Sequence, residues 1–413
     1  MKAIYMKCVK CGNQQQLSQN YSCKQCGGIL QIQYDYSNSE IRKKSERIGL
    51  LKYADYLPVN AEYFVTLGEG DTPLLKANHL GRWLGLKKLY LKDEGCNPTG
   101  SFKDRSVAVG ISKTLEFGAN TIIIASSGNG GASAAAYAAK AGLRAVVIVP
   151  ADTPINKVNQ AIMYGAQVIK VEGPYSNSYH VAKKAAENYG WVNLTTTFIN
   201  PYIVEGNKTI AYEIVESLGW TVPNWIVVPV GDGPVLVGIW RGFMDLKAVG
   251  AISRLPKIAA VQAERCAPIV RAFENGKDTV DPWTMGAGTI ASGIADTLDG
   301  YSEDGTLTLK CIRESEGYAV SLSEEEIWES VVTLARAEGV FAEPTGAVSV
   351  IGMRKMIAQG LMTSNETVVA IITGNGLKTP HLPPNYSHEP QVVKDADELN
   401  GLILERNCLP HAI

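Results

Sequence analysis

A single lysine stands inside a motif of nine residues, 97–105, which reads Asn-Pro-Thr-Gly-Ser-Phe-Lys-Asp-Arg. Turn-forming residues precede Lys103 and helix-compatible residues follow it, so the spacing predicts this lysine at the start of a helix. Lysine forms Schiff bases with carbonyl compounds, and its amine becomes a nucleophile when it is removed from water. Lys103 is therefore a candidate for covalent attachment of an aldehyde.

A second motif, Ser126-Ser127-Gly128-Asn129-Gly130, lies between an apolar stretch at 121–125 and an alanine-rich stretch at 132–141. The first stretch is typical of a buried strand and the second of a helix. A loop that leads into a helix offers unpaired backbone N–H groups and the positive end of the helix dipole. This loop is therefore predicted to bind an anion, although a simple tight turn would have the same composition.

A third motif, Gly231-Asp232-Gly233-Pro234, separates a predicted strand at 226–230 from a predicted helix at 235–243. Glycine lets the backbone approach a phosphate closely. A dinucleotide fingerprint would require glycine at position 236, where the chain has Leu236, so nicotinamide binding is rejected on spacing. An acidic side chain repels phosphate, and we expect Asp232 to point away from it. A phosphate loop beside Lys103 suits an aldehyde cofactor that carries a phosphate.

A fourth loop, Thr373-Gly374-Asn375-Gly376, follows a predicted strand at 367–372. Further short apolar runs at 145–149, 167–171 and 258–262 alternate with predicted helices. This alternation is typical of an α/β fold with parallel sheets, in which ligands bind at the carboxyl ends of the strands. All four motifs fall at such ends or beside them.

Together these motifs resemble those of the threonine synthase family, which is a group of fold-type II pyridoxal-phosphate enzymes. The resemblance extends over about residues 68–378. It implies an α/β fold like that of the tryptophan synthase β chain, with two three-layer αβα domains and parallel-rich sheets. It also implies that Lys103 binds the cofactor, that Asn129 contacts the 3′ oxygen and that Thr373 faces the pyridine nitrogen. The other cofactor contacts that it implies are Phe102, Gly231, Asp232, Gly233, Pro234 and Val235.

The same resemblance implies conversion of O-phosphohomoserine, a small amino-acid substrate, and water to L-threonine and phosphate. The expected substrate contacts are Ser126, Ser127, Gly128, Ser176, Asn177 and Asn200. Gly130 stands where the family commonly has threonine, and no arginine lies near Ser176. Two other functions of this fold therefore stay open, β-replacement on serine derivatives and deamination of serine or threonine. A non-catalytic cofactor-binding or zinc-ribbon interaction protein is a further alternative, although it would not need Lys103, Asn129 and Thr373 together.

Four cysteines, Cys8, Cys11, Cys23 and Cys26, form two Cys-x-x-Cys pairs near the N-terminus. Two such pairs favour a tetrahedral structural zinc site, and a redox pair is the alternative. Four thiolate ligands would leave no open position on the metal, so a catalytic role is not expected. We therefore expect a zinc ribbon at residues 1–35 and a cofactor-dependent region at 36–413, with a smaller subdomain at about 104–200 inserted in a larger one.

The composition sets the remaining expectations for this chain of 413 residues. A net charge of −2 and a pI near 6.3 give no electrostatic reason to expect nucleic-acid or membrane partners. Eight cysteines are too few for a disulfide scaffold, and the sequence has no secretion signal and no membrane-spanning apolar run. We expect a cytoplasmic enzyme, and the family resemblance implies a homodimer.

Overall fold

The computed structural model describes residues 1–413 except 38, 40, 42–45, 287, 380–391 and 400–413. The described chain contains three sheets. The N-terminal sheet is antiparallel and has the strand order β2-β1-β3. Cys8 ends β1, and Cys11, Cys23 and Cys26 lie in the segments that connect the strands. Its strands are β1 (Lys2–Cys8), β2 (Gln14–Gln15) and β3 (Leu30–Asp35).

The largest sheet has the order β12-β11-β10-β13-β5-β4, and all of its strands except β4 are parallel to their neighbours. Its strands are β4 (Leu74–Lys76), β5 (Lys88–Asp93), β10 (Trp225–Pro229), β11 (Lys257–Ala263), β12 (Tyr318–Leu322) and β13 (Thr367–Ile372). Every residue of β10 is buried, because helices cover both faces of a parallel sheet. The carboxyl ends of β10 and β13 therefore lie side by side at one edge.

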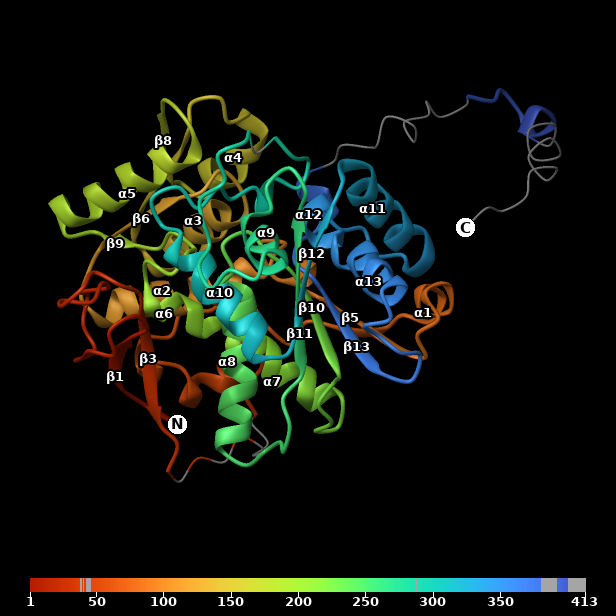
Figure 1. Ribbon diagram of the computed structural model, residues 1–413. Coiled ribbons are helices and arrows are strands. Elements are labelled where there is room, and N and C mark those ends of the chain that lie inside the picture. The colour runs from red at the N-terminus through yellow and green to blue at the C-terminus, as the bar shows by residue number, and fades with distance from the viewer. Residues whose placement is uncertain (38, 40, 42–45, 287, 380–391, 400–413) are drawn as a thin grey trace.

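The smaller sheet is wholly parallel and has the order β8-β7-β6-β9. Its strands are β6 (Thr121–Ala125), β7 (Arg144–Pro150), β8 (Gln167–Val171) and β9 (Val192–Asn193), and the helices between them are α3 (Asn129–Ala141), α4 (Ile155–Met163) and α5 (Tyr175–Tyr189). Figure 1 shows these elements at the upper left, while β5, β10 and β13 lie to the right.

The other helices surround the largest sheet or connect it to the smaller one. They are α1 (Asn78–Leu84), α2 (Lys103–Glu116), α6 (Pro201–Gly206), α7 (Lys208–Ser217), α8 (Pro234–Ala248), α9 (Pro268–Glu274), α10 (Glu303–Glu314), α11 (Glu324–Glu338), α12 (Pro344–Ala347) and α13 (Ser349–Ala358). Short 3₁₀ turns are η1 (Gly49–Tyr56), η2 (Ala61–Tyr63), η3 (Glu94–Cys96), η4 (Ser292–Ile294) and η5 (Gly376–Lys378). Helix α2 packs against both α3 and α6, and it is buried from Asp104 to Thr114.

The predicted α/β fold with parallel sheets is confirmed. Several boundaries differ from expectation, and α3, for example, begins at Asn129 and not after the glycine pair that follows it. A side chain at Gly131 would place its Cβ 2.7 Å from the carbonyl oxygen of Ser126, so the glycines allow the helix to begin close to the strand. Within the described residues, no helix is both long and apolar enough to cross a membrane.

Candidate active site

The lysine motif and the fourth predicted loop lie against each other. Ser101 pairs with Gly374 in an isolated antiparallel bridge, and the Phe102 amide donates to the Thr373 carbonyl oxygen at 3.1 Å. Gly100 has a φ of +86°, and its carbonyl oxygen accepts from the Asn375 amide at 2.9 Å. These contacts fix the first turn of α2, and with it Lys103, at the carboxyl end of β13.

The Lys103 amine is half-buried at the first position of α2. Its Nζ donates to Thr196 Oγ1 at 2.7 Å and lies 4.7 Å from the centre of the Phe102 ring. Burial lowers the pKa of Lys103, and the carboxylates of Asp232, Asp296 and Glu343 oppose that shift. A lower pKa leaves a larger fraction of the amine unprotonated and able to attack a carbonyl group.

Asn129 begins α3 and contacts a carboxyl group that the sequence analysis did not identify. Its Nδ2 donates to Glu343 Oε1 at 2.6 Å. Glu343 is buried just before α12, and its amide donates to the Gly374 carbonyl oxygen at 3.1 Å. Burial raises the pKa of Glu343, whereas Lys378 and the Asn129 hydrogen bond oppose the rise. The Glu-Pro step at a helix start was the only local signal for Glu343.

The third predicted loop connects β10 to the N-terminus of α8. Gly233 has a φ of +113°, and a Cβ there would lie 2.0 Å from Thr308 Oγ1. The same hydroxyl donates to the Asp232 carbonyl oxygen at 2.7 Å, so Thr308 on α10 holds the loop in place. The first backbone N–H groups of a helix have no partner within it. The loop therefore has the geometry of an anion site.

Asp232 is buried within this loop, and its Oδ2 has no hydrogen-bond partner among the described residues. Burial raises the pKa of Asp232 to about 7, and Asp296 adds to the rise, while Lys103 opposes it. Asp296 follows η4 and approaches Gly231, where a Cβ would lie 3.4 Å from the Asp296 Cβ. The sequence analysis gave no reason to expect Asp296 here, because the two residues are distant along the chain.

Thr373 ends β13 with a hydroxyl that is buried and has no partner among the described residues. Such an atom calls for an explanation, since buried polar atoms in native proteins almost always have a partner. A ring nitrogen placed against this hydroxyl would supply one. The residues that the structure places around Lys103 therefore fit a phosphorylated pyridine aldehyde.

The predicted substrate contacts lie in three places. Ser126, Ser127 and Gly128 are half-buried between β6 and the start of α3. Asn200 caps α6, because its Oδ1 accepts from the Tyr202 amide at 3.0 Å and its Nδ2 donates to the Asn193 carbonyl oxygen at 3.0 Å. Ser176 and Asn177 lie in the first turn of α5, and Ser176 is buried whereas Asn177 is exposed. As substrate contacts, all six residues stay predictions.

Contacts in the folded chain explain why a glycine stands at position 130. A Cβ at this position would lie 3.0 Å from Ser126 Oγ and 3.3 Å from Thr196 Oγ1. A larger side chain would therefore press on the hydroxyl that accepts from Lys103. Thr196 itself follows β9 and was not identified from the sequence.

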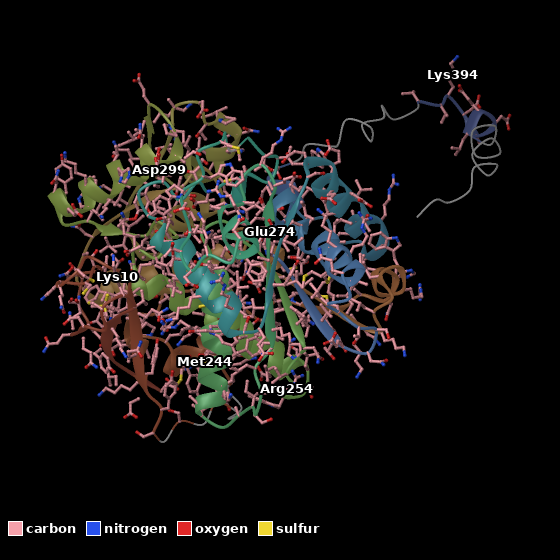
Figure 2. The ribbon with its side chains drawn as sticks, in the orientation of Figure 1. Lys10, Met244, Arg254, Glu274, Asp299 and Lys394 are labelled. Carbon is pink, nitrogen blue, oxygen red and sulfur yellow. The ribbon has the colours of Figure 1, made fainter. Side chains whose placement is uncertain are left out.

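The four clustered cysteines come together at the N-terminal sheet, and their Sγ atoms all lie within 4.8 Å of one another. Cys11 Sγ lies 3.6 Å from Cys23 Sγ, and Cys8 Sγ lies 3.5 Å from Cys26 Sγ. Lys10, labelled in Figure 2, lies between two of these cysteines in sequence, and its Nζ is 2.5 Å from Glu303 Oε1 at the start of α10. This geometry suits four thiolate ligands around one metal ion.

Comparisons with known proteins identify the family of this chain. Residues 65–374 match the family model described as pyridoxal-phosphate dependent enzyme. The threonine synthase of Methanocaldococcus jannaschii is 40% identical over 411 residues, covering 97% of this chain and 100% of the relative. The threonine synthase of Methanosarcina acetivorans is 41% identical over 394 residues, covering 94% and 96%.

Solved structures of more distant proteins share the fold. Maize serine racemase superposes with a TM-score of 0.61 at 22% identity, covering 74% of this chain and 89% of the other. Threonine deaminase isoform 2 of Solanum lycopersicum superposes with a TM-score of 0.63 at 21% identity, covering 82% and 92%. The long, near-complete similarity to the two synthases is more specific, and this chain belongs to the threonine synthase family of pyridoxal-phosphate dependent enzymes.

Proposed function

We propose that this protein converts O-phosphohomoserine and water to L-threonine and phosphate. The observation that carries the proposal is the half-buried Lys103 amine at the start of α2, surrounded by loops that end β6, β10 and β13. The similarity to the Methanocaldococcus jannaschii threonine synthase over 97% of the chain supports this choice of reaction.

The proposed cofactor, pyridoxal phosphate, would supply an electron sink for negative charge at the substrate α carbon. Lys103 would hold it covalently, Phe102 would lie beside the lysine, and the Thr373 hydroxyl would meet the ring nitrogen. Asn129 would contact the 3′ oxygen attached to the pyridine ring. The contacts proposed for its phosphate are Gly231, Asp232, Gly233, Pro234 and Val235.

The residues of this chain would then position the substrate and move its protons. The N-terminus of α3, with Ser126, Ser127 and Gly128, is proposed to bind the substrate carboxylate through backbone N–H groups. Lys103, once displaced by the substrate amine, would remove the α proton, because the same amine can serve first as a covalent anchor and then as a base. Thr196 Oγ1, 2.7 Å away, would hold that amine in place.

The leaving phosphate of the substrate is proposed to lie near α5 and the loop after β9. Ser176, Asn177 and Asn200 are the candidates from the sequence. Asn200 Oδ1 already caps α6 and its Nδ2 donates to the Asn193 carbonyl oxygen of β9, so its contribution would be to shape the loop. Replacing Asn200 with Asp would keep the cap acceptor and place a negative charge beside the phosphate, and we expect the KM for O-phosphohomoserine to rise.

The test is to mix the cofactor-loaded protein with O-phosphohomoserine and to measure released phosphate and the amino-acid product. Equal amounts of threonine and phosphate, absent with Lys103→Ala, would support the proposal. A loaded protein that releases no phosphate would refute this reaction. O-phosphoserine and O-acetylserine would then test β-replacement, and serine and threonine would test deamination.

We also propose that Cys8, Cys11, Cys23 and Cys26 bind one structural zinc ion within a ribbon at residues 1–35. The mutual approach of their Sγ atoms within 4.8 Å supports this proposal. Elemental analysis should find one zinc per chain, and Cys11→Ser should lower that value to near zero. A zinc-free protein purified without chelators, with its thiols intact, would contradict it.

The remaining proposals concern organisation. We propose a homodimer in the cytoplasm without nucleic-acid or membrane partners, and a subdomain at about 104–200 within the region 36–413. The family resemblance implies the homodimer, the composition carries no electrostatic reason for such partners, and the separate sheet β6–β9 supports the subdomain. Light scattering at micromolar concentration would give twice the 44.5 kDa chain mass for a dimer. A single-chain mass would contradict the dimer.

A further inference from the structure

The Asp232 carboxyl group is buried in the loop that resembles a phosphate site. The residue is 9% exposed, and its Oδ2 has no partner among the described residues. The backbone N–H groups of Asp232 and Gly233 interact with the carboxyl group and favour its ionised form. The Thr308 hydroxyl holds the Asp232 carbonyl oxygen, so the backbone at this residue cannot rotate freely.

The groups that face Asp232 are mostly acids and phenols. Asp296 on the loop after η4 and Asp304 on α10 lie near it, as do the phenols Tyr175 and Tyr179 on α5 and Tyr301. Lys103 on α2 is the cation that acts on it. Two acids and one half-buried lysine do not stabilise a further negative charge, and burial raises the pKa of Asp232 to about 7.

A metal ion is not the natural partner of this carboxyl group. Among the described residues, the cysteine cluster is the only group of three or more candidate ligand atoms that lie close together. A neutral carboxyl group, by contrast, has one oxygen that accepts and one O–H that donates. The N–H contacts would satisfy the accepting oxygen, and the O–H would still need an acceptor.

We propose that Asp232 binds a phosphate monoester as a neutral acid, with its O–H donating to a phosphate oxygen. The inference rests on the proposed function, because it assumes that a phosphorylated cofactor or substrate enters this site. Sequence reasoning expected Asp232 to turn away from phosphate. A proton on the carboxyl group removes the repulsion and adds a hydrogen bond to an anionic acceptor, which is among the stronger kinds.

Phosphate binding should therefore weaken as Asp232 ionises. The neutral fraction of an acid with a pKa of about 7 falls about thirtyfold from pH 6 to pH 8.5. Apparent affinity falls in proportion to the binding-competent fraction. Asparagine at this position keeps a donor and cannot ionise, so Asp232→Asn should bind with little dependence on pH.

The test uses pyridoxamine 5′-phosphate, which has no aldehyde and so does not react with Lys103. Its Kd for the cofactor-free protein is measured by fluorescence at pH 6 and pH 8.5. We expect the wild-type Kd to rise at least tenfold more than that of Asp232→Asn. Asp299→Asn, at an exposed position labelled in Figure 2, is the matched control and should follow the wild type.

A second arm separates the two possible sources of phosphate. The cofactor-loaded wild type and Asp232→Asn are titrated with inorganic phosphate, and binding is read from the visible absorption band. A pH effect in the pyridoxamine 5′-phosphate arm assigns Asp232 to the cofactor phosphate. An effect in the inorganic phosphate arm alone assigns it to the phosphate of the substrate. Equal pH dependence of wild type and Asp232→Asn in both arms overturns the inference.

If Asp232→Asn does not fold, the wild type can be tested with pyridoxamine, which lacks the phosphate group. The wild-type Kd for this ligand should lack the loss of affinity at high pH that its phosphorylated form shows. The same loss with both ligands would overturn the inference for the cofactor phosphate. None of these binding measurements depends on turnover, so an error in the proposed reaction would not be mistaken for an error here.

Discussion

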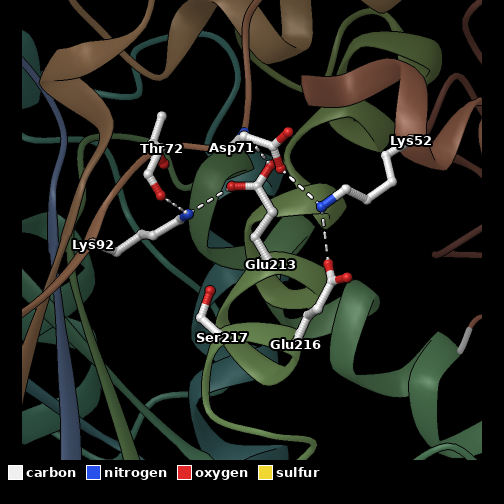
Figure 3. A pocket seen from close by; sticks show the side chains of 7 residues that line it. All are labelled: Lys52, Asp71, Thr72, Lys92, Glu213, Glu216 and Ser217. Carbon is white, nitrogen blue, oxygen red and sulfur yellow. Dashed lines mark hydrogen bonds and ion pairs between the residues drawn. The ribbon is translucent and has the colours of Figure 1, made fainter. Parts of the chain in front are cut away.

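Lys103 and Arg105 are two positions apart on helix α2 and lie in opposite surroundings, one in the candidate active site and the other in a buried structural network. Arg105 is fully buried between Glu94 and Glu213, with nitrogen–oxygen distances of 2.6–2.9 Å. Lys92 Nζ adds a contact of 2.6 Å to Glu213, and Figure 3 shows that pair beside Thr72. In this network two cations face two carboxylates, and Arg105 and Lys92 hold the pKa of Glu213 at about 2.

Lys103 lies in an environment where the charges do not balance. Asp232, Asp296 and Glu343 act on its amine, and burial raises the pKa of each of these acids. A network in which the charges balance can have a purely structural role. An excess of buried acids raises the free energy of the folded chain, and such groups concentrate at functional sites. The difference indicates which residues to mutate for stability and which for activity.

The largest effect is expected from removing the amine of the unbalanced region. Lys103→Ala should lower kcat/KM by at least about a thousandfold, because both covalent attachment and proton transfer are lost. The protein should remain folded and should lose the visible absorption band of lysine-bound cofactor. Lys140→Ala, at an exposed position of α3, is the control and should retain activity and band. A persistent band in Lys103→Ala would contradict the assignment of the attachment site.

A mutation in the balanced network around Arg105 should change the stability of the protein. Arg105→Met leaves Glu94 and Glu213 buried without their main partner, which we expect to lower the free energy of unfolding by about 3–5 kcal/mol. Denaturant unfolding measures this change. The surface pair of Arg313 and Asp278, 2.7 Å apart, offers a matched control. Arg313→Met should change the free energy of unfolding by less than about 1 kcal/mol, and equal effects of the two variants would contradict the comparison.

A smaller effect is expected from Glu343. Glu343→Ala leaves the Asn129 amide without its acceptor, at a cost of about 1–3 kcal/mol if the site stays buried. Misplacement of Asn129 should then lower kcat/KM by about tenfold. Glu343→Gln keeps an acceptor oxygen and should remain within about threefold of wild type. Steady-state kinetics separates the two outcomes, and equal losses in both variants would point to the charge of Glu343 instead of its hydrogen bond.

The sequence predicted those features whose position depends on neighbouring residues along the chain. Lys103 at a helix start and the loops after β6, β10 and β13 could be predicted, because strand periodicity and glycine placement are local signals. Asn200 shows the limit of such signals, since asparagine before Pro201 suits a helix cap as well as a ligand contact.

The partners of the site were not predictable in the same way. Glu343 meets Asn129 across 214 positions, and Thr196 meets Lys103 across 93. Such contacts depend on how the two parallel sheets pack, and a single sequence does not specify that packing. The acids around Lys103 come from three separate segments, the loop after β10, the loop after η4 and the residue before α12. Only the folded chain places them beside the same amine.

The most direct test of the comparison is the stability of cofactor-free Asp232→Asn as a function of pH. The neutral form of Asp232 stabilises the fold below its ordinary pKa of 3.8, and that contribution is lost as the pH rises through about 7. Asparagine does not ionise, so the variant should exceed wild type in unfolding free energy by up to about 4 kcal/mol at pH 8. The difference should shrink towards pH 4.5. A variant that is less stable than wild type at pH 8, or a difference that does not change with pH, would contradict the account.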